Sequence, residues 1–354
     1  MGAGLESMYR TDHLSMRDNA LYFPYISLPN IDWTVKSLLY WDKLSSIVPM
    51  EYIDRPDQLS PFMRELVEGG LVEQIFPTHY LYRIKQFEQC FIGLIERKAK
   101  VLAAKQSGDL KLIKPRTRIH MEKLGNIPEF LMEQGLAERV NLFWYDIDTR
   151  IANIFMAYLA SCLGAVPEVN AAPVTNLSMY SSIFGYLNHS YRRDNAIHHD
   201  KARQVVLREL LPTPNESVTP DQLVRFKECH GHLLPALRRK IEAHCAQVAV
   251  LKNAEDQITL TEDFIGQCRL EIDEIVDAMK PTWKRISFGS ISPLFGAGLA
   301  WYTTDTGNHL AYASAALSFA GAAYQAISSI SDNRDKLLSR PLAYIAHAHS
   351  GIYA

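Results

Sequence analysis

An apolar segment rich in glycine and alanine, residues 286–330, constrains the architecture more than any other part of this sequence. Two apolar stretches, SFGSISPLFGAGLAW and LAYASAALSFAGAAYQAISSI, are separated by the polar residues 303–308. Small residues allow helices to approach each other closely, so the pattern predicts a hairpin of two apolar helices. The glycines expected on its contact surface are Gly289, Gly296, Gly298 and Gly321.

The sequence leaves open what this hairpin packs against. Each arm is short or only mildly apolar beside the ~20 strongly apolar residues of a standard membrane span. Pro293, His309 and Gln325 interrupt the apolar character further. The sequence therefore favours a hairpin buried in a helical core. A membrane hairpin that a trigger releases and an oligomer interface are the two alternatives.

Composition indicates a globular protein of the cytosol. The 354 residues carry a formal net charge of −2, so no overall field favours nucleic acid or an anionic membrane. The five cysteines are scattered without a CxxC pair, which fits a reducing compartment. The N-terminal residues are polar and lack the apolar core of a signal peptide. We therefore expect a cytoplasmic location.

The first 211 residues predict an α/β domain, because strand-like and helix-like segments alternate. Strands are expected at residues 20–28, 71–77, 140–147 and 202–210, and helices at 33–48, 61–68, 81–104 and 149–164. Residues 165–176 are expected to form a loop. Three prolines within residues 211–220 predict a boundary between this domain and a helical domain at residues 220–354.

The second domain is expected to begin with a long antiparallel pair of helices. Thr219 and Gln222 form a capping box around Pro220, and apolar residues then recur at three- and four-residue spacing to residue 248. Pro235 should kink this helix. A second long helix is expected from Thr261, followed by the apolar hairpin and a short helix at 342–352. The fold class expected is therefore α+β and predominantly helical.

One short motif suggests nucleic-acid chemistry. Arg193 and His198 match the R-x4-H spacing of HEPN ribonucleases, where arginine binds phosphate and histidine acts near the scissile 2′-hydroxyl. The spacing also recurs elsewhere in the chain. That motif belongs on a helix, whereas the residues after His198 predict a strand. A ribonuclease is therefore an alternative hypothesis.

Two aspartates form a second candidate site. Asp146 and Asp148 lie at a predicted strand-to-helix junction, where α/β folds place ligands. A helix cap formed by Asp148, with Asp146 exposed, is the favoured interpretation.

A metal site is not expected. Cys229, His230 and His232, with His244 and Cys245, have the side chains that bind zinc. However, Cys229 and Cys245 would stand more than four turns apart on one helix, roughly 24 Å. The chain also has no P-loop, no GxGxxG after a strand and no HExxH. We therefore expect no metal and no cofactor.

A basic run provides a candidate surface for nucleic acid. It spans residues 97–118 and consists of Arg97, Lys98, Lys100, Lys105, Lys111, Lys114, Arg116 and Arg118. No aromatic residues that could stack on bases are interleaved with it. A solvated helix end is therefore the favoured interpretation, and nucleic-acid binding is the alternative.

The opening sequence ALYFPYISLPNIDWTVKSLLYWDKLSSIVP resembles an uncharacterised bacterial family with a Leu-Tyr-aromatic-Pro strand and a helix that contains Leu-Tyr-Trp-Asp. Further matches are FMAYLASCLG with PVTN, and VVLRELLPTP followed by FKECHGHLLPALR. Asn176 stands where an acid is common in the family. The resemblance implies an accessory or defence-type bacterial protein but supplies no reaction. We therefore expect an interaction or effector component that acts by assembly with a protein partner or as a homo-oligomer, with a membrane-active effector as an alternative.

Overall fold

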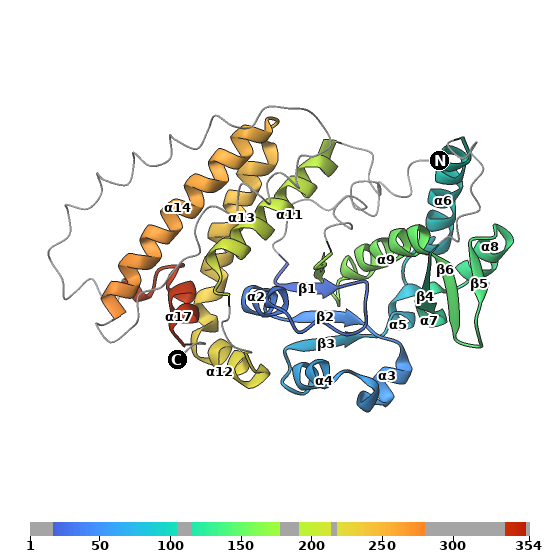
Figure 1. Ribbon diagram of the computed structural model, residues 1–354, viewed down its shortest axis with the longest axis horizontal. Helices are drawn as coiled ribbons and strands as arrows, with labels where there is room; N and C mark the ends of the chain where they lie inside the picture. Colours follow the sequence, from blue (N-terminus) through green and yellow to red (C-terminus); the bar gives the residue numbers. More distant parts are fainter. Residues whose placement is uncertain (1–16, 105–114, 178–190, 214–217, 280–336, 352–354) are drawn as a thin grey trace.

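The computed structural model describes residues 17–104, 115–177, 191–213, 218–279 and 337–351 (Figure 1). Within these residues the protein is predominantly helical, with an N-terminal α/β part and a C-terminal helical part, which confirms the predicted fold class. The apolar segment 286–330, including Gly289, Gly296, Gly298 and Gly321, lies outside the described residues.

A parallel four-stranded sheet forms the centre of the α/β part. Its strands are β1 (Asn19–Tyr22), β2 (Leu44–Ile47), β3 (Val72–Ile75) and β7 (Ala171–Val174), in the order β3-β2-β1-β7. The strand β1 therefore pairs with β2 on one side and β7 on the other. Because the chain order reverses beside β1, the carboxyl end of this strand is a topological switch point.

Helices cover both faces of this sheet (Figure 1). The side chains of β1 alternate, so Tyr22 joins one core cluster and Leu21 joins the other. The helices on the Tyr22 face are α2 (Asp32–Tyr40) and α4 (Pro61–Glu68), and those on the Leu21 face are α6 (Phe87–Ala104) and α9 (Thr149–Gly164).

A second, antiparallel sheet adjoins the carboxyl ends of β2 and β3. It consists of β4 (Arg116–His120), β6 (Trp144–Asp148) and β5 (Ala137–Arg139), in the order β4-β6-β5. The short helices around it are α3 (Met50–Asp54), η1 (Pro56–Gln58), α5 (Thr78–Leu81), α7 (Met121–Leu124) and α8 (Ile127–Glu133).

The helical part begins with α11 (Tyr191–Leu210), which packs along α13 (Leu234–Val250) and α14 (Ala254–Met279). The helices α13 and α14 are joined by a short turn and run antiparallel, as predicted (Figure 1). The other described elements of this part are α12 (Pro220–His230), η2 (Gly231–Leu233) and α17 (Ala343–Gly351). The predicted capping box of Thr219 and Gln222 is present at the start of α12.

Several boundaries differ from those predicted. The helix expected at residues 33–48 ends at Tyr40, and Leu44–Ile47 is the buried strand β2. Pairing with β1 and β3 decides this segment, because four buried residues between two strands gain a full set of ladder hydrogen bonds. Residues 171–174, expected in a loop, form β7 for the same reason.

The strand expected at residues 202–210 is instead the end of α11. Ala202, Val206 and Leu210 are fully buried and stand four residues apart, which is the spacing of one helix face. The long helix expected to residue 248 is broken by η2, and Pro235 lies in the first turn of α13, where proline is tolerated. The helix α14 begins at Ala254 rather than Thr261.

One core cluster extends from the sheet into the helical part. Leu38 and Leu39 of α2 belong to the same cluster of buried side chains as Leu237 and Ile241 of α13. The helical part thus covers one side of the sheet. The division of the chain near residues 211–220 stays a prediction.

Candidate functional site

The Leu-Tyr-Trp-Asp segment at the end of α2 is held by the helical part. The Tyr344 hydroxyl donates to the carbonyl oxygen of Leu39 at 2.7 Å. The Lys227 ammonium donates to the carbonyl oxygens of Trp41 at 2.6 Å and Asp42 at 2.7 Å. These contacts join segments that are far apart in sequence, so the end of α2 and the loop after it are where the helical part is attached to the α/β part.

Arg238 completes this attachment. Its guanidinium, on α13, is only 2% exposed and donates to the Asp42 carboxylate at 2.6 Å. It also donates to the carbonyl oxygen of Asp18 at 2.8 Å, just before β1. The burial of a charged group is compensated by these charge-assisted bonds.

A second polar network lies between α11, α13 and α2. Arg203 donates from Nε to Glu242 Oε1 at 2.6 Å and from Nη2 to Oε2 at 2.8 Å. His199 Nε2 lies 3.3 Å from Glu242 Oε2, and the Tyr40 hydroxyl donates to Glu242. Burial acts to raise the pKa of Glu242, but the bonds and charge of Arg203 outweigh it and hold that pKa below its usual value. The pair is largely buried and joins α11 to α13.

The candidate ribonuclease residues lie on α11. Arg193 and His198 both fall within Tyr191–Leu210, so the motif is helical rather than next to a strand. The side chain of Arg193 lies outside the described residues, whereas His198 is partly buried. The prediction that a strand follows His198, which counted against the ribonuclease motif, was therefore wrong.

The two candidate aspartates are engaged in local structure. Asp148 accepts a hydrogen bond from the Arg150 backbone at 3.0 Å and is the N-cap of α9, as the favoured interpretation predicted. Asp146 accepts from Arg118 Nε at 2.9 Å and Nη2 at 3.1 Å across the β4–β6 pair. These hydrogen bonds from Arg118 lower the pKa of Asp146.

The basic run is only partly described. Arg116 pairs with Glu138 at 2.9 Å, and Arg118 pairs with Asp146. Two of its charges are therefore compensated within the second sheet. Lys105, Lys111 and Lys114 lie outside the described residues.

The candidate zinc ligands do not converge. Cys229 is exposed, while His230 stacks on His347 with ring centroids 4.1 Å apart. His232 lies in η2. In the described parts of the chain, no three histidine, cysteine, aspartate or glutamate side chains are placed together to hold a metal ion.

The structure instead brings together titratable groups that the sequence did not single out. His120, at the end of β4, is 3% exposed and has Glu51 Oε1 3.9 Å from its Nε2 and Glu122 Oε2 3.5 Å from its Nδ1. Glu51 follows β2 on α3, and the Met50 backbone donates to Glu122 at 2.9 Å. This group, with Lys123, is called the His120 cluster below.

The His120 cluster lies where the second sheet meets the carboxyl edge of the parallel sheet. The Thr78 hydroxyl, just after β3, donates to the carbonyl oxygen of Glu122 at 3.2 Å. The Glu122 backbone donates to Nδ1 of His120 at 3.3 Å, so Nε2 carries the proton of the neutral ring. Burial lowers the pKa of His120, partly opposed by Glu122 and Glu51. Perturbed titratable groups at this edge are typical of a ligand site.

Lys123 is the most unusual member of the cluster. It is only 5% exposed, and among the described residues it has no hydrogen-bond or ion-pair partner. Burial alone lowers the pKa of its ammonium group to about 7.

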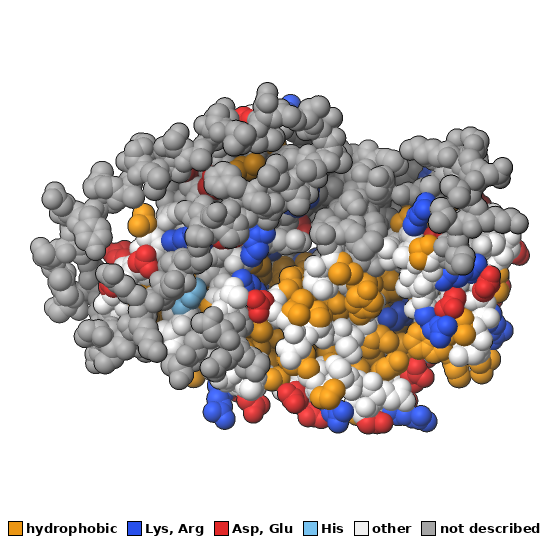
Figure 2. Space-filling view, viewed as in Figure 1, with side chains coloured by type: hydrophobic (Ala, Val, Ile, Leu, Met, Phe, Trp, Pro, Cys, Tyr) orange, Lys and Arg blue, Asp and Glu red, His pale blue; other side chains and the backbone are white. Residues whose placement is uncertain are grey.

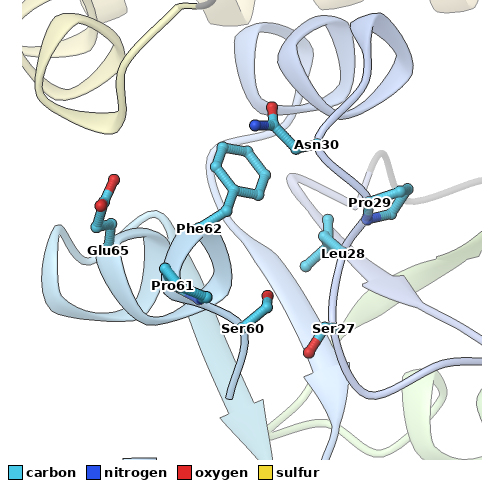
Figure 3. A pocket seen from close by; sticks show the side chains of 8 residues that line it. All are labelled: Ser27, Leu28, Pro29, Asn30, Ser60, Pro61, Phe62 and Glu65. Carbon is cyan, nitrogen blue, oxygen red and sulfur yellow. The ribbon is translucent and has the colours of Figure 1, made fainter. Parts of the chain in front are cut away.

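Two apolar surface features flank this edge. The first is an open pocket of about 660 Å³ between the β1–α2 loop and the start of α4. Figure 3 shows the ring of Phe62 pointing toward Asn30, with Leu28 and Pro29 on the other side. Pro61, Ser27, Ser60 and Glu65 complete the lining.

The second feature is the tip of the β5–β6 hairpin, Val140–Phe143. Leu142 is 62% exposed and Phe143 48%. The Asn141 side chain accepts from the Phe143 and Trp144 backbones at 2.9 and 3.0 Å, and Arg139 donates to the carbonyl oxygen of Asn141 at 3.1 Å. The hydrogen bonds of Asn141 and Arg139 thus hold the loop in a shape that presents apolar side chains to solvent. Figure 2 shows hydrophobic side chains over the strands and at this end of the hairpin.

The chain matches no protein-family model, and no curated protein and no solved structure is significantly similar to it.

Proposed function

We propose that the protein is an interaction or effector component that works by self-assembly. In this proposal the tip of the β5–β6 hairpin, Val140–Phe143, of one copy is seated in the pocket beside Phe62 of the next copy. The observation that supports this proposal most is the ordered, exposed apolar tip. An isolated exposed leucine is ordinary, but a loop whose hydrogen bonds hold neighbouring Leu142 and Phe143 outward resembles an interface anchor.

A second copy is the occupant that the surface chemistry favours. The tip is convex and apolar, and the pocket is concave and lined by Leu28, Pro29, Pro61 and Phe62. The two features lie on different parts of the same chain, and the proposed contact, in which the tip of each copy enters the pocket of the next, is head-to-tail. Such contacts build rings or filaments rather than closed dimers. The resemblance noted above suggests a bacterial stress or phage-defence setting in the cytoplasm.

The test measures particle mass as a function of concentration for the full chain. Native protein should form species larger than a monomer, and Leu142→Asp should shift them to monomer. Leu270→Asp is the matched control, because Leu270 is 59% exposed on α14, away from both features. A native protein that stays monomeric at every concentration would overturn the proposal.

A mixing experiment distinguishes head-to-tail contact from other assembly. Leu142→Asp removes the tip and Phe62→Ser removes the pocket, so each variant alone should be monomeric. An equimolar mixture retains one intact interface and should form dimers but nothing larger. If the mixture stays monomeric, or if both variants still assemble, the tip-in-pocket arrangement is wrong.

A ribonuclease is the second candidate function, supported by the position of Arg193 and His198 on α11, a helix that packs against α13 and α14. Cleavage of a labelled RNA that is lost in His198→Ala would support it. Unchanged cleavage in that variant would reject it.

The membrane-active alternative concerns a segment outside the described residues. Of the helices that are described, none is both long and apolar enough to cross a bilayer.

A further inference from the structure

The hairpin tip rests on a buried histidine. The ring of Phe143 lies parallel to the ring of His120, with centroids 6.0 Å apart and planes inclined by 4°. The Met121 backbone N–H donates to the carbonyl oxygen of Phe143 at 2.8 Å. Trp144 meets the same imidazole edge-on, with centroids 4.9 Å apart. His120 and the residue after it therefore support the side chain and the backbone of Phe143.

This support depends on the neutral form of the imidazole. Nδ1 of His120 accepts from the Glu122 backbone N–H at 3.3 Å, which caps the start of α7. A proton on Nδ1 turns this acceptor into a donor, so two N–H groups then face each other. The hydrogen bond between the ring and α7 is therefore lost on protonation.

The charged groups around the ring determine where a protonated imidazole moves. Glu122 Oε2 lies 3.5 Å from Nδ1 and Glu51 Oε1 lies 3.9 Å from Nε2, both too far for a strong hydrogen bond. Lys123 on α7 opposes the charge of the ring, and the chain at the start of β6 faces it with the rings of Phe143 and Trp144. A charged imidazole is stabilised by moving closer to either carboxylate, and this movement disturbs its stack with Phe143.

We propose that protonation of His120 releases the hairpin tip, so that mild acidification dissolves the assembly. This inference rests on the proposed head-to-tail contact and names its regulation. An anchor that is already ordered loses less conformational entropy on binding, so a released Phe143 binds its pocket more weakly. Burial lowers the pKa of His120, and Glu122 and Glu51 oppose this effect only in part. The folded protein therefore favours the neutral ring, and the switch operates as pH falls below about 6.5.

Particle mass measured between pH 7.5 and 5.0 tests this regulation on the full chain, with circular dichroism as the check that it stays folded. The association constant of the native protein should fall by about 2- to 10-fold on acidification, which corresponds to the loss of one hydrogen bond. Asparagine accepts from the Glu122 backbone but takes up no proton, so His120→Asn should assemble equally at both pH values. His79→Asn, at an exposed histidine of α5, is the matched control and should keep the native pH dependence.

A second variant tests the same ring without replacing it. Glu51→Gln removes a carboxylate that stabilises the charged imidazole, so the midpoint of dissociation should move to lower pH. A midpoint that stays in place would overturn the proposal. This measurement also decides the matter if His120→Asn does not fold.

Hydrogen exchange in the variant Leu142→Asp measures the release of the tip without assembly. Relative to its intrinsic rate, the Met121 amide should exchange faster at pH 5.0 than at pH 7.5. Protection that is the same at both pH values would overturn the proposal. Native assembly that is equally strong at both pH values would overturn only the switch, whereas a native chain that is monomeric at every pH would overturn the head-to-tail contact itself.

Discussion

Glu242 of α13 binds Arg203 of α11 through two parallel hydrogen bonds of 2.6 and 2.8 Å, and both side chains are largely buried, 13% and 14% exposed. This pair joins the two helices over the end of α2. Breaking a buried pair leaves an uncompensated charge, so Glu242→Gln should lower the free energy of unfolding by about 3 to 5 kcal/mol. Urea denaturation followed by circular dichroism measures this change.

A double variant separates the pair itself from the penalty of an orphaned charge. In Arg203→Met/Glu242→Leu both charges are gone, so the loss of stability should be smaller than in Glu242→Gln alone. A single variant as stable as the native protein would show that the pair is not the contact that joins α11 to α13.

Gly164 ends α9 against β7. A Cβ atom at this position would lie 2.3 Å from the carbonyl oxygen of Ala171, which is backbone and cannot move aside. Gly164→Ala should therefore destabilise the fold by several kcal/mol, roughly 2 to 4, or prevent soluble expression. Thermal unfolding of the purified variant measures the effect.

Gly266 provides the matched control, because it lies inside α14 with nothing within 4 Å of a new Cβ. Gly266→Ala should stabilise the protein by about 0.5 to 1 kcal/mol through the higher helix propensity of alanine. Equal effects of the two substitutions would contradict the close approach of α9 to β7.

His244 makes stability depend on pH. It is 4% exposed, stacks on Phe264 with centroids 4.0 Å apart, and burial lowers its pKa to about 4. The unfolded chain, with a histidine pKa near 6.5, then binds the proton more tightly than the folded chain. The stability that depends on neutral His244 is therefore fully present above pH 6.5. As pH falls toward 4, the free energy of unfolding decreases by at most about 3 kcal/mol.

Urea midpoints measured between pH 7.5 and 4.5 check this dependence. His347, whose pKa burial also lowers to about 4, should contribute in the same direction. His244→Phe should therefore flatten the profile in part. A profile unchanged by that substitution would show that His244 does not remain neutral in the folded protein.

Tyr344 tests the attachment of α17 to α2. Its fully buried hydroxyl donates to the carbonyl oxygen of Leu39 at 2.7 Å. Tyr344→Phe leaves that carbonyl without this donor and should lower the free energy of unfolding by about 1 to 2 kcal/mol. Tyr25→Phe, at a tyrosine that is 57% exposed, should change it by less than ~0.5 kcal/mol.

Two helix caps show where sequence reasoning succeeds. Asp148 accepts a hydrogen bond from the Arg150 backbone, and Thr219 forms its capping box with Gln222, both as predicted. Each of these caps joins groups within three residues of one another. Their hydrogen bonds need no distant partner, so the local sequence contains all the information.

The candidate sites show the opposite case. Asp146, Asp148, Cys229 and His230 stood out because of their residue type. The structure places Asp146 in an ion pair, Asp148 in a helix cap, His230 in a ring stack and Cys229 at an exposed position. The His120 cluster gave no such signal. Glu51 and His120 are 69 positions apart, and only the meeting of two sheets brings them together.

The sequence by itself determined the class of the fold and the caps at Asp148 and Thr219, because helix caps and helical periodicity arise from neighbouring residues. The tertiary structure alone decided that residues 44–47 form a strand and that residues 202–210 continue a helix. It also buried Lys123 without a partner among the described residues. The physical reason is that strand pairing and burial depend on groups far away in the chain, and their contribution overrides local preference.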